Sequence, residues 1–187
     1  MNTRRFPAMT AVLGLASALA TAGALAAEIE GVTLAPESVY SGQRLELVGC
    51  GTREMMFFVD VYVISLYLPA PPADAVMDPG TTKLVQLNII YDGSVPDDLP
   101  DEWRSRLENQ ISQEMLRTLQ GFYKDIRGGD IVTIGYAPDS GTAIRVNGET
   151  VVTQPGNSLI DAMLELWIGE DPISGNLKRL LLQSPCS

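Results

Sequence analysis

One long apolar stretch constrains the fold of this chain more than any other feature. From Met56 to Leu68 nearly every side chain is apolar, aromatic or β-branched, which is typical of a mostly buried β-strand. At about 3.3 Å per residue it spans roughly 40 Å, so we expect a central strand of a sheet. Alternation divides its side chains between two faces: Phe57, Val59, Val61, Val63, Ser65 and Tyr67 on one, and Phe58, Asp60, Tyr62, Ile64, Leu66 and Leu68 on the other.

An arginine precedes this strand, in the segment Gly49-Cys50-Gly51-Thr52-Arg53. The two glycines let the backbone turn or approach another element closely. A guanidinium beside a buried strand is costly to desolvate without an anionic or strongly accepting partner. Arg53 is therefore a candidate binding residue. The alternatives are that it bonds carbonyl groups of a turn, or that it pairs with a surface carboxylate such as Glu54.

The first 26 residues have the pattern of a secretory signal peptide. Arg4 and Arg5 form a positive n-region, residues 11–20 are apolar, and Ala24-Leu25-Ala26 is a small-residue cleavage site. The apolar segment is short and rich in alanine for a membrane anchor. We expect cleavage near Ala26, by the Sec or the twin-arginine route. The periplasmic or secreted product, residues 27–187, is then a single domain without stable membrane insertion.

Charge and composition exclude several function classes. Arg4 and Arg5 leave with the signal peptide, so the formal charge of -10 becomes -12, which disfavours nucleic acid and anionic membranes as partners. Histidine is absent, which removes His-based acid–base catalysis and most zinc or copper sites. One group of acidic residues resembles the solvated start of a helix more than a calcium site: Asp97, Asp98, Asp101 and Glu102. We expect no metal and no cofactor.

The chain has two cysteines, Cys50 and Cys186. A disulfide between them would close a loop of about 135 residues, and an oxidising compartment would preserve it. Two unpaired thiols are the alternative. A catalytic thiol is disfavoured because no histidine is available to activate it.

Hydrophobic periodicity predicts the remaining elements. We expect strands at 29–34, 44–48, 83–91, 131–136, 142–146 and 150–153, with a hairpin turn at Asn147-Gly148. One long helix follows Pro100, with apolar residues at every fourth position: Trp103, Leu107, Ile111, Met115 and Leu119. Two more helices begin near Ser158 and Ser174. This order predicts an α+β domain with an antiparallel sheet covered by helices.

Three separate segments resemble the chalcone isomerase-like family: GCGTREMMFFVDVYVISLYLP (49–69), EWRSRLENQ (102–110) and LELWIGEDPISGNLKRLL (164–181). The segment VNGETVVTQPG (146–156) also resembles a hairpin of the bacterial members. Together the resemblance covers most of residues 30–182. It implies an open-faced β-sandwich, in which a large antiparallel sheet carries helices packed on one face.

The family's enzymes close a flavanone ring, which requires a cation near an oxyanion and hydrogen-bond donors where charge develops. The resemblance carries their site positions onto Arg53, Tyr62, Trp103, Gln110 (or Asn109 after a one-residue slip) and Leu166. Leu166 has no donor, and Trp103 has only an indole N–H. At roughly 2–4 kcal/mol per lost oxyanion donor, we expect the ring-closing reaction to be largely lost.

An arginine–tyrosine pair suits a carboxylate, because the guanidinium binds it bidentately and the phenol adds a third hydrogen bond. Fatty-acid-binding members of the family resemble this arrangement. We predict a non-catalytic protein that binds a small amphipathic, fatty-acid-like acid. The candidate ligand-binding residues are Arg53, Tyr62, Trp103, Gln110, Leu166 and Trp167. The alternatives are a weak chalcone isomerase-type lyase that uses Arg53, and a scaffold for a protein partner.

Overall fold

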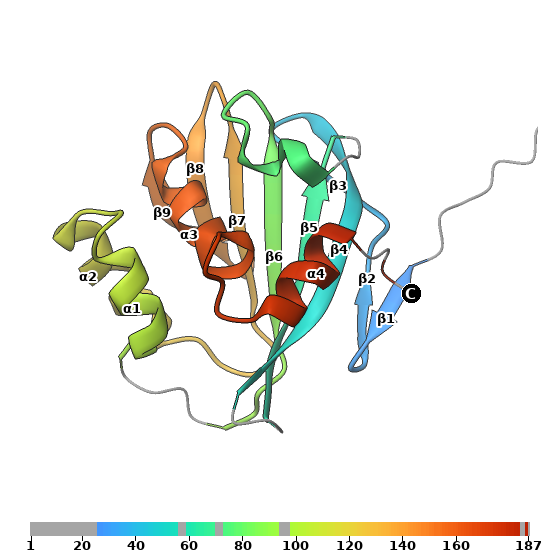
Figure 1. The fold of residues 1–187 in the computed structure, drawn as a ribbon, viewed down its shortest axis with the longest axis horizontal. Helices are drawn as coiled ribbons and strands as arrows, with labels where there is room; N and C mark the ends of the chain where they lie inside the picture. The colour runs from blue at the N-terminus through green and yellow to red at the C-terminus, as the bar shows by residue number, and fades with distance from the viewer. Residues whose placement is uncertain (1–25, 56–58, 70–72, 94–97, 184–185, 187) are drawn as a thin grey trace, which may run out of the picture.

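The computed structural model describes residues 26–55, 59–69, 73–93, 98–183 and 186. Its largest element is a curled antiparallel sheet of seven strands, which lie side by side in sequence order (Figure 1). The strands are Glu37–Tyr40 (β3), Gln43–Met55 (β4), Val59–Leu68 (β5), Lys83–Ile89 (β6), Ile131–Ala137 (β7), Gly141–Val146 (β8) and Glu149–Gln154 (β9).

Helices cover one face of this sheet (Figure 1). They are Asp101–Leu107 (α1), Gln113–Tyr123 (α2), Ser158–Ile168 (α3) and Gly175–Gln183 (α4), with a short 3₁₀ helix at Ala73–Met77 (η1). The predicted α+β class, with helices on one face of an antiparallel sheet, is confirmed. None of the helices in the described part of the chain is both long and apolar enough to cross a membrane.

The alternation predicted along β5 is confirmed from Tyr62 to Leu68, whereas Val61, predicted on the face of Val63, packs against the main core. Tyr62, Ile64 and Leu66 belong to the main core beneath the helices. Val63 and Tyr67 pack in two smaller apolar clusters on the opposite face. β5 pairs with β4 on one side and β6 on the other, so it is an interior strand as expected. Residues 56–58 of the predicted strand lie outside the described residues.

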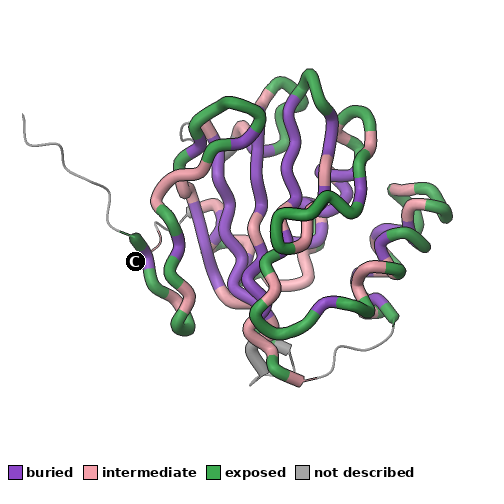
Figure 2. Tube along the Cα trace, turned by 180° about the vertical axis from the view of Figure 1, so that it is seen from behind, coloured by how far each residue is buried: buried purple, intermediate pink, exposed green. Residues whose placement is uncertain are grey.

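The back of the sheet is covered partly by Ala27 and Leu34, which pack on Cys50 and Val63, and partly by its own edge strand. Seen from behind, the middle strands are buried along much of their length, whereas the turns and the outer sides of α1 and α2 are exposed (Figure 2). Tyr40 of β3 lies over β7, where a Cβ on Gly135 would fall 2.2 Å from the Tyr40 ring. A glycine is therefore required at that position for the edge strand to fold over the sheet.

The predicted strand at 29–34 is wrong as a single element. It is a hairpin of Ala27–Ile29 (β1) and Val32–Leu34 (β2), which turns at Glu30 and Gly31 with φ of 49° and 73°. Residues 37–40, which are not among the predicted strands, form strand β3. Short strands around left-handed turns leave little periodicity, which explains both errors.

The glycine-rich segment before Arg53 is a strand and not a turn, because β4 runs unbroken from Gln43 to Met55. Its glycines allow the close approach of another element, which was the second possibility offered by the sequence. A Cβ on Gly49 would lie 2.0 Å from the carbonyl oxygen of Leu181 in α4, and one on Gly51 would lie 2.9 Å from a methyl carbon of Leu177. The missing side chains therefore let α4 pack directly on the β4 backbone.

The long helix predicted after Pro100 is two helices. α1 ends at Leu107, and α2 begins after Ser112, whose hydroxyl accepts a hydrogen bond from the Met115 backbone N–H at 3.1 Å. The four-residue spacing of apolar side chains continues across the break. This spacing shows which side chains are buried, but it does not show whether the helix backbone is continuous. Ser112 is the local signal for the second start.

Cys50 and Cys186 form a disulfide, with Cα atoms 5.5 Å apart. Gly49 and Gly51 meet α4 on the helix-covered face, whereas Cys50 packs with Val63 on the other face. Cys186 is therefore bonded to the back of β4, whereas α4 packs on its front.

Candidate functional site

A small cavity of about 60 Å³ lies between the sheet and helices α1, α2 and α3. Its floor is formed by β5 to β8 and its roof by the helices and the segment before α1. Most of its lining is apolar and includes Leu87, Ile89, Leu119, Phe122, Val132 and Met163. Polar side chains reach it at one end, where Arg53, Tyr62 and Glu102 contribute to the lining.

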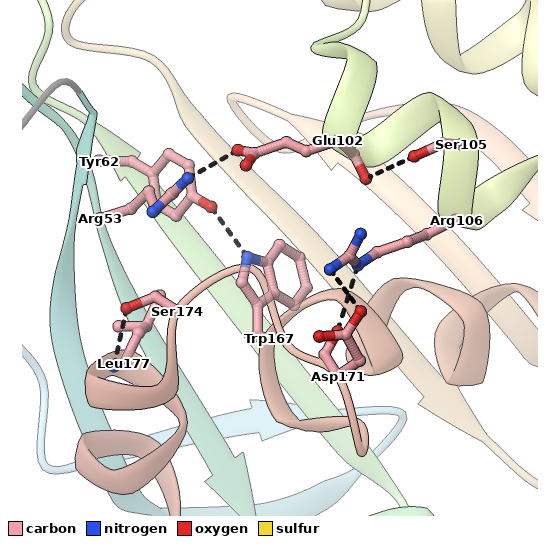
Figure 3. A network of polar contacts seen from close by, with 9 residues as sticks. All are labelled: Arg53, Tyr62, Glu102, Ser105, Arg106, Trp167, Asp171, Ser174 and Leu177. Atoms are coloured by element: carbon pink, nitrogen blue, oxygen red, sulfur yellow. Dashed lines mark hydrogen bonds and ion pairs between the residues drawn. The ribbon is translucent and has the colours of Figure 1, made fainter.

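Arg53 and Tyr62 lie directly opposite each other in the β4–β5 pair, so their side chains share the helix-covered face. Arg53 donates a hydrogen bond from Nη2 to Oε1 of Glu102 at 2.6 Å (Figure 3). Its side chain is only 14% exposed, whereas that of Glu102 is 38% exposed. The sequence-based alternative, that Arg53 pairs with a carboxylate near the surface, thus agrees with the structure, but the partner is Glu102 in the first turn of α1 and not Glu54.

The Tyr62 hydroxyl is buried and accepts a hydrogen bond from the indole Nε1–H of Trp167 at 2.8 Å (Figure 3). Burial raises the pKa of Tyr62 well above its usual value, although the Trp167 hydrogen bond and the nearby Arg53 act in the opposite direction. Tyr62 therefore stays protonated at neutral pH. It is a hydrogen-bond donor and not a phenolate base.

This burial predicts a loss of stability in alkaline solution. The unfolded chain releases a tyrosine proton near pH 10, whereas the folded chain retains that of Tyr62 to higher pH. The stabilising contribution is complete below about pH 10 and is lost as the pH rises above it, because the unfolded state then binds fewer protons. Urea denaturation between about pH 8 and pH 11 measures the slope. Tyr62→Phe should show a shallower decline than the wild type, and equal slopes would contradict this.

Trp103 of α1 joins the polar end to the apolar wall. Its ring packs edge-on against Tyr62, with centroids 6.4 Å apart, and against Trp167, with centroids 5.8 Å apart. Tyr123 of α2 packs on it with centroids 6.5 Å apart. Trp103 and Trp167 are the two tryptophans of the sequence, so intrinsic fluorescence reports on this site.

The structure brings together some of the residues that the sequence singled out. Arg53, Tyr62 and Trp103 line the cavity, and Trp167 reaches it through its hydrogen bond to Tyr62. Leu166 is fully buried in the main core and is not among the lining residues.

Gln110 is also separate from the cavity. It is exposed after α1 and lines an open cleft of about 440 Å³ with Arg106, Glu165, Glu170 and Asp171. The alternative residue Asn109 is exposed too, and its amide donates to the Ser105 carbonyl oxygen at 3.3 Å. The break between α1 and α2 accounts for this, because the turn carries both amides away from the sheet.

Glu102 is the site residue that the sequence did not identify. The acidic group at the helix start was expected to be solvated, yet Glu102 is half-buried against Arg53. Asp98 lies 3.6 Å from Arg104, and Asp97 lies outside the described residues. Arg53 and Glu102 are separated by 49 positions, so no local pattern signals their pairing.

The arrangement offers a guanidinium and a neutral phenol at one end of an apolar enclosure, a combination that suits a polar head group and a hydrocarbon tail. Trp103 and Leu166, onto which the resemblance carries two positions of the ring-closing enzymes, have no hydroxyl group to donate to an oxyanion.

Comparison with known proteins places these features in context. A family model described as chalcone isomerase-like matches residues 26–183. No curated protein sequence matches the chain. Among solved structures, a fatty-acid binding protein of Arabidopsis thaliana is similar, with a TM-score of 0.59 and 17% sequence identity over 81% of this chain and 92% of that one. At this identity the similarity shows a common fold.

Proposed function

Because the chain belongs to the chalcone isomerase-like family, we propose that it is an exported, non-catalytic protein that binds a small amphipathic acid of the fatty-acid type. The carboxylate binds to Arg53 and Tyr62, and the hydrocarbon tail occupies the apolar part of the cavity. The observation that carries the proposal is the Arg53 guanidinium. It is only 14% exposed and lies beside Tyr62 at the end of a largely apolar cavity.

The polar end supplies the groups that a carboxylate needs. A guanidinium and a phenol from adjacent strands point to the same face, and both are held by the sheet and not by a loop. The indole N–H of Trp167 donates a hydrogen bond to the Tyr62 hydroxyl and holds it in place. A site that is ordered before binding loses less conformational entropy when the ligand arrives.

The cavity must enlarge to admit a ligand. Its volume of about 60 Å³ is well below the roughly 300 Å³ at which small-molecule sites begin. Its floor is the hydrogen-bonded sheet, whereas part of its roof is α1, which spans seven residues and has no side-chain hydrogen bond at its N-cap, Pro100. Short helices without caps are weakly stable on their own. We therefore assign the enlargement to movement of α1, since α2 is longer and is capped by Ser112.

Displacement of a fluorescent fatty acid tests the proposal. Arg53→Ala should bind the probe about tenfold to a hundredfold more weakly than the wild type, because hydrogen bonds to a charged group contribute about 1.5–3 kcal/mol. Arg117→Ala is the matched control, since Arg117 is an exposed arginine on α2 outside the cavity lining. Equal affinities for the wild type and both variants would exclude Arg53 as the head-group residue.

Export rests on the pattern of residues 1–26 and is favoured by the disulfide, since such bonds persist in oxidising compartments. An intact mass that begins at Ala27, measured on protein recovered from the periplasm or medium, tests this part of the proposal. An intact N-terminus on that protein would contradict it.

A further inference from the structure

The group that a ligand carboxylate needs is already engaged by a carboxylate of the protein itself. Oε1 of Glu102 lies 2.6 Å from Nη2 of Arg53, and Glu102 lines the same cavity. Among the described residues, no other side-chain hydrogen bond is made by Arg53. In the structure the polar end thus contains a paired cation and anion and not an unpaired cation.

We propose that Glu102 is the residue that sets head-group specificity: its carboxylate competes with the carboxylate of the ligand for Arg53. This inference rests on the proposed function and adds a residue to it. An entering acid either replaces Glu102 on the guanidinium or binds beside it and meets a like charge. Both arrangements weaken the binding of an acid. An amphiphile with an uncharged hydroxyl head meets no such repulsion and can accept from Arg53 without displacing Glu102.

The two partners differ in which of them can leave. Arg53 belongs to β4, and its side chain is only 14% exposed. If Glu102 left without a replacement, the guanidinium would be a poorly hydrated cation. Glu102 is 38% exposed and belongs to the first turn of α1, so its carboxylate returns to water when it leaves. The competition therefore ends with Glu102 outside the cavity and the ligand on Arg53.

The departure of Glu102 is coupled to the roof of the cavity. Trp103 is the next residue, and its ring packs on Tyr62 and Trp167. A displacement of the first turn of α1 moves this ring together with the carboxylate. Replacement of Glu102 by the ligand and enlargement of the cavity are thus parts of the same movement, which tryptophan fluorescence follows.

Glu102→Gln tests the inference because it keeps the size of the side chain and removes its charge. The affinities of decanoate and decan-1-ol are measured by titration calorimetry and by tryptophan fluorescence. The variant should bind decanoate about tenfold more tightly than the wild type, since a partly buried charged hydrogen bond no longer has to be broken. Its affinity for decan-1-ol should remain within about twofold, because no charge is displaced.

Two further variants separate direct competition from other effects. Asp101→Asn removes a charge from the neighbouring position of the same helix turn, where Asp101 is exposed, and should change neither affinity by more than about twofold. Glu102→Asp keeps the charge on a shorter side chain, so its gain for decanoate should lie between those of the wild type and Glu102→Gln. Thermal melting establishes that each variant is folded.

The outcomes distinguish this inference from the proposed function. If the wild type binds decanoate and Glu102→Gln binds it no better, Glu102 is not a competitor, while the proposed function stands. An equal gain for decanoate and decan-1-ol would show that Glu102 only obstructs entry, and an equal gain from Asp101→Asn would show a general charge effect; either result overturns the inference. If no variant binds either compound, the proposed function fails and the inference fails with it.

Discussion

Cys186→Ser is expected to lower the free energy of unfolding by about 4–5 kcal/mol. The disulfide links positions separated by 136 residues, so its loss returns a long loop to the unfolded ensemble. It also releases Cys186 from the back of β4. Urea denaturation of oxidised wild type and variant measures the difference, and typical domain stabilities of about 5–15 kcal/mol make it easy to detect.

Two controls identify the disulfide as the cause. Reduction should destabilise the wild type by a similar amount and leave Cys186→Ser unchanged. Cys50→Ser should resemble Cys186→Ser, with a small added cost because Cys50 is more deeply buried. Equal stability of Cys186→Ser and wild type, in protein shown to contain no free thiol, would contradict the prediction.

Gly49→Ala is expected to destabilise the protein by about 3 kcal/mol, at the upper end of the cost of overpacking. The added Cβ would lie 2.0 Å from the carbonyl oxygen and 2.5 Å from the carbonyl carbon of Leu181. These are backbone atoms of α4, so no side-chain rotation relieves the clash and the helix must move off the strand. Chemical denaturation measures the loss, and hydrogen exchange should show that it is greatest in α4.

Other glycines provide matched controls for this substitution. Gly51→Ala lies on the same face of β4, but its Cβ would meet side-chain carbons of Leu177 and Leu180 at 2.9 and 3.0 Å. Those side chains can adjust, so its cost should be nearer 1 kcal/mol. Gly121→Ala in α2 meets nothing within 4 Å and should stabilise the helix by about 0.5–1 kcal/mol. A cost for Gly49→Ala no larger than that of Gly51→Ala would show that α4 is not rigidly seated.

Features with a strong local period were predictable from sequence. The alternation of β5 assigned Tyr62 to the helix-covered face correctly, because one-face burial fixes the register of a strand. The Asn147-Gly148 hairpin is confirmed, with φ of 51° and 86° at the two turn residues. Both predictions depend on neighbours in sequence, whose geometry the backbone itself constrains.

The features that sequence did not predict depend on contacts between distant segments. For Gly49 the sequence left a turn and a close approach equally open, because it does not show that a helix packs on the backbone there. Glu102 was read as solvated because its partner Arg53 is on a strand far away in the chain. Gln110 lies away from the cavity for a related reason: the turn between α1 and α2, which ends at the Ser112 cap, directs this amide to another cleft.

The order of the strands bears on how this fold can diversify. Every strand of the seven-stranded sheet pairs with its neighbour in sequence. The longest connection between two of these strands, residues 90–130, therefore joins β6 to β7, which are adjacent in the sheet. That connection contains α1 and α2, with Glu102, Trp103 and the apolar wall around Leu119. The part of the roof to which we assign head-group specificity is therefore one contiguous segment. If the proposed function holds, exchanging this segment for one of another length or sequence should change the ligand preference and leave the β6–β7 register unaltered.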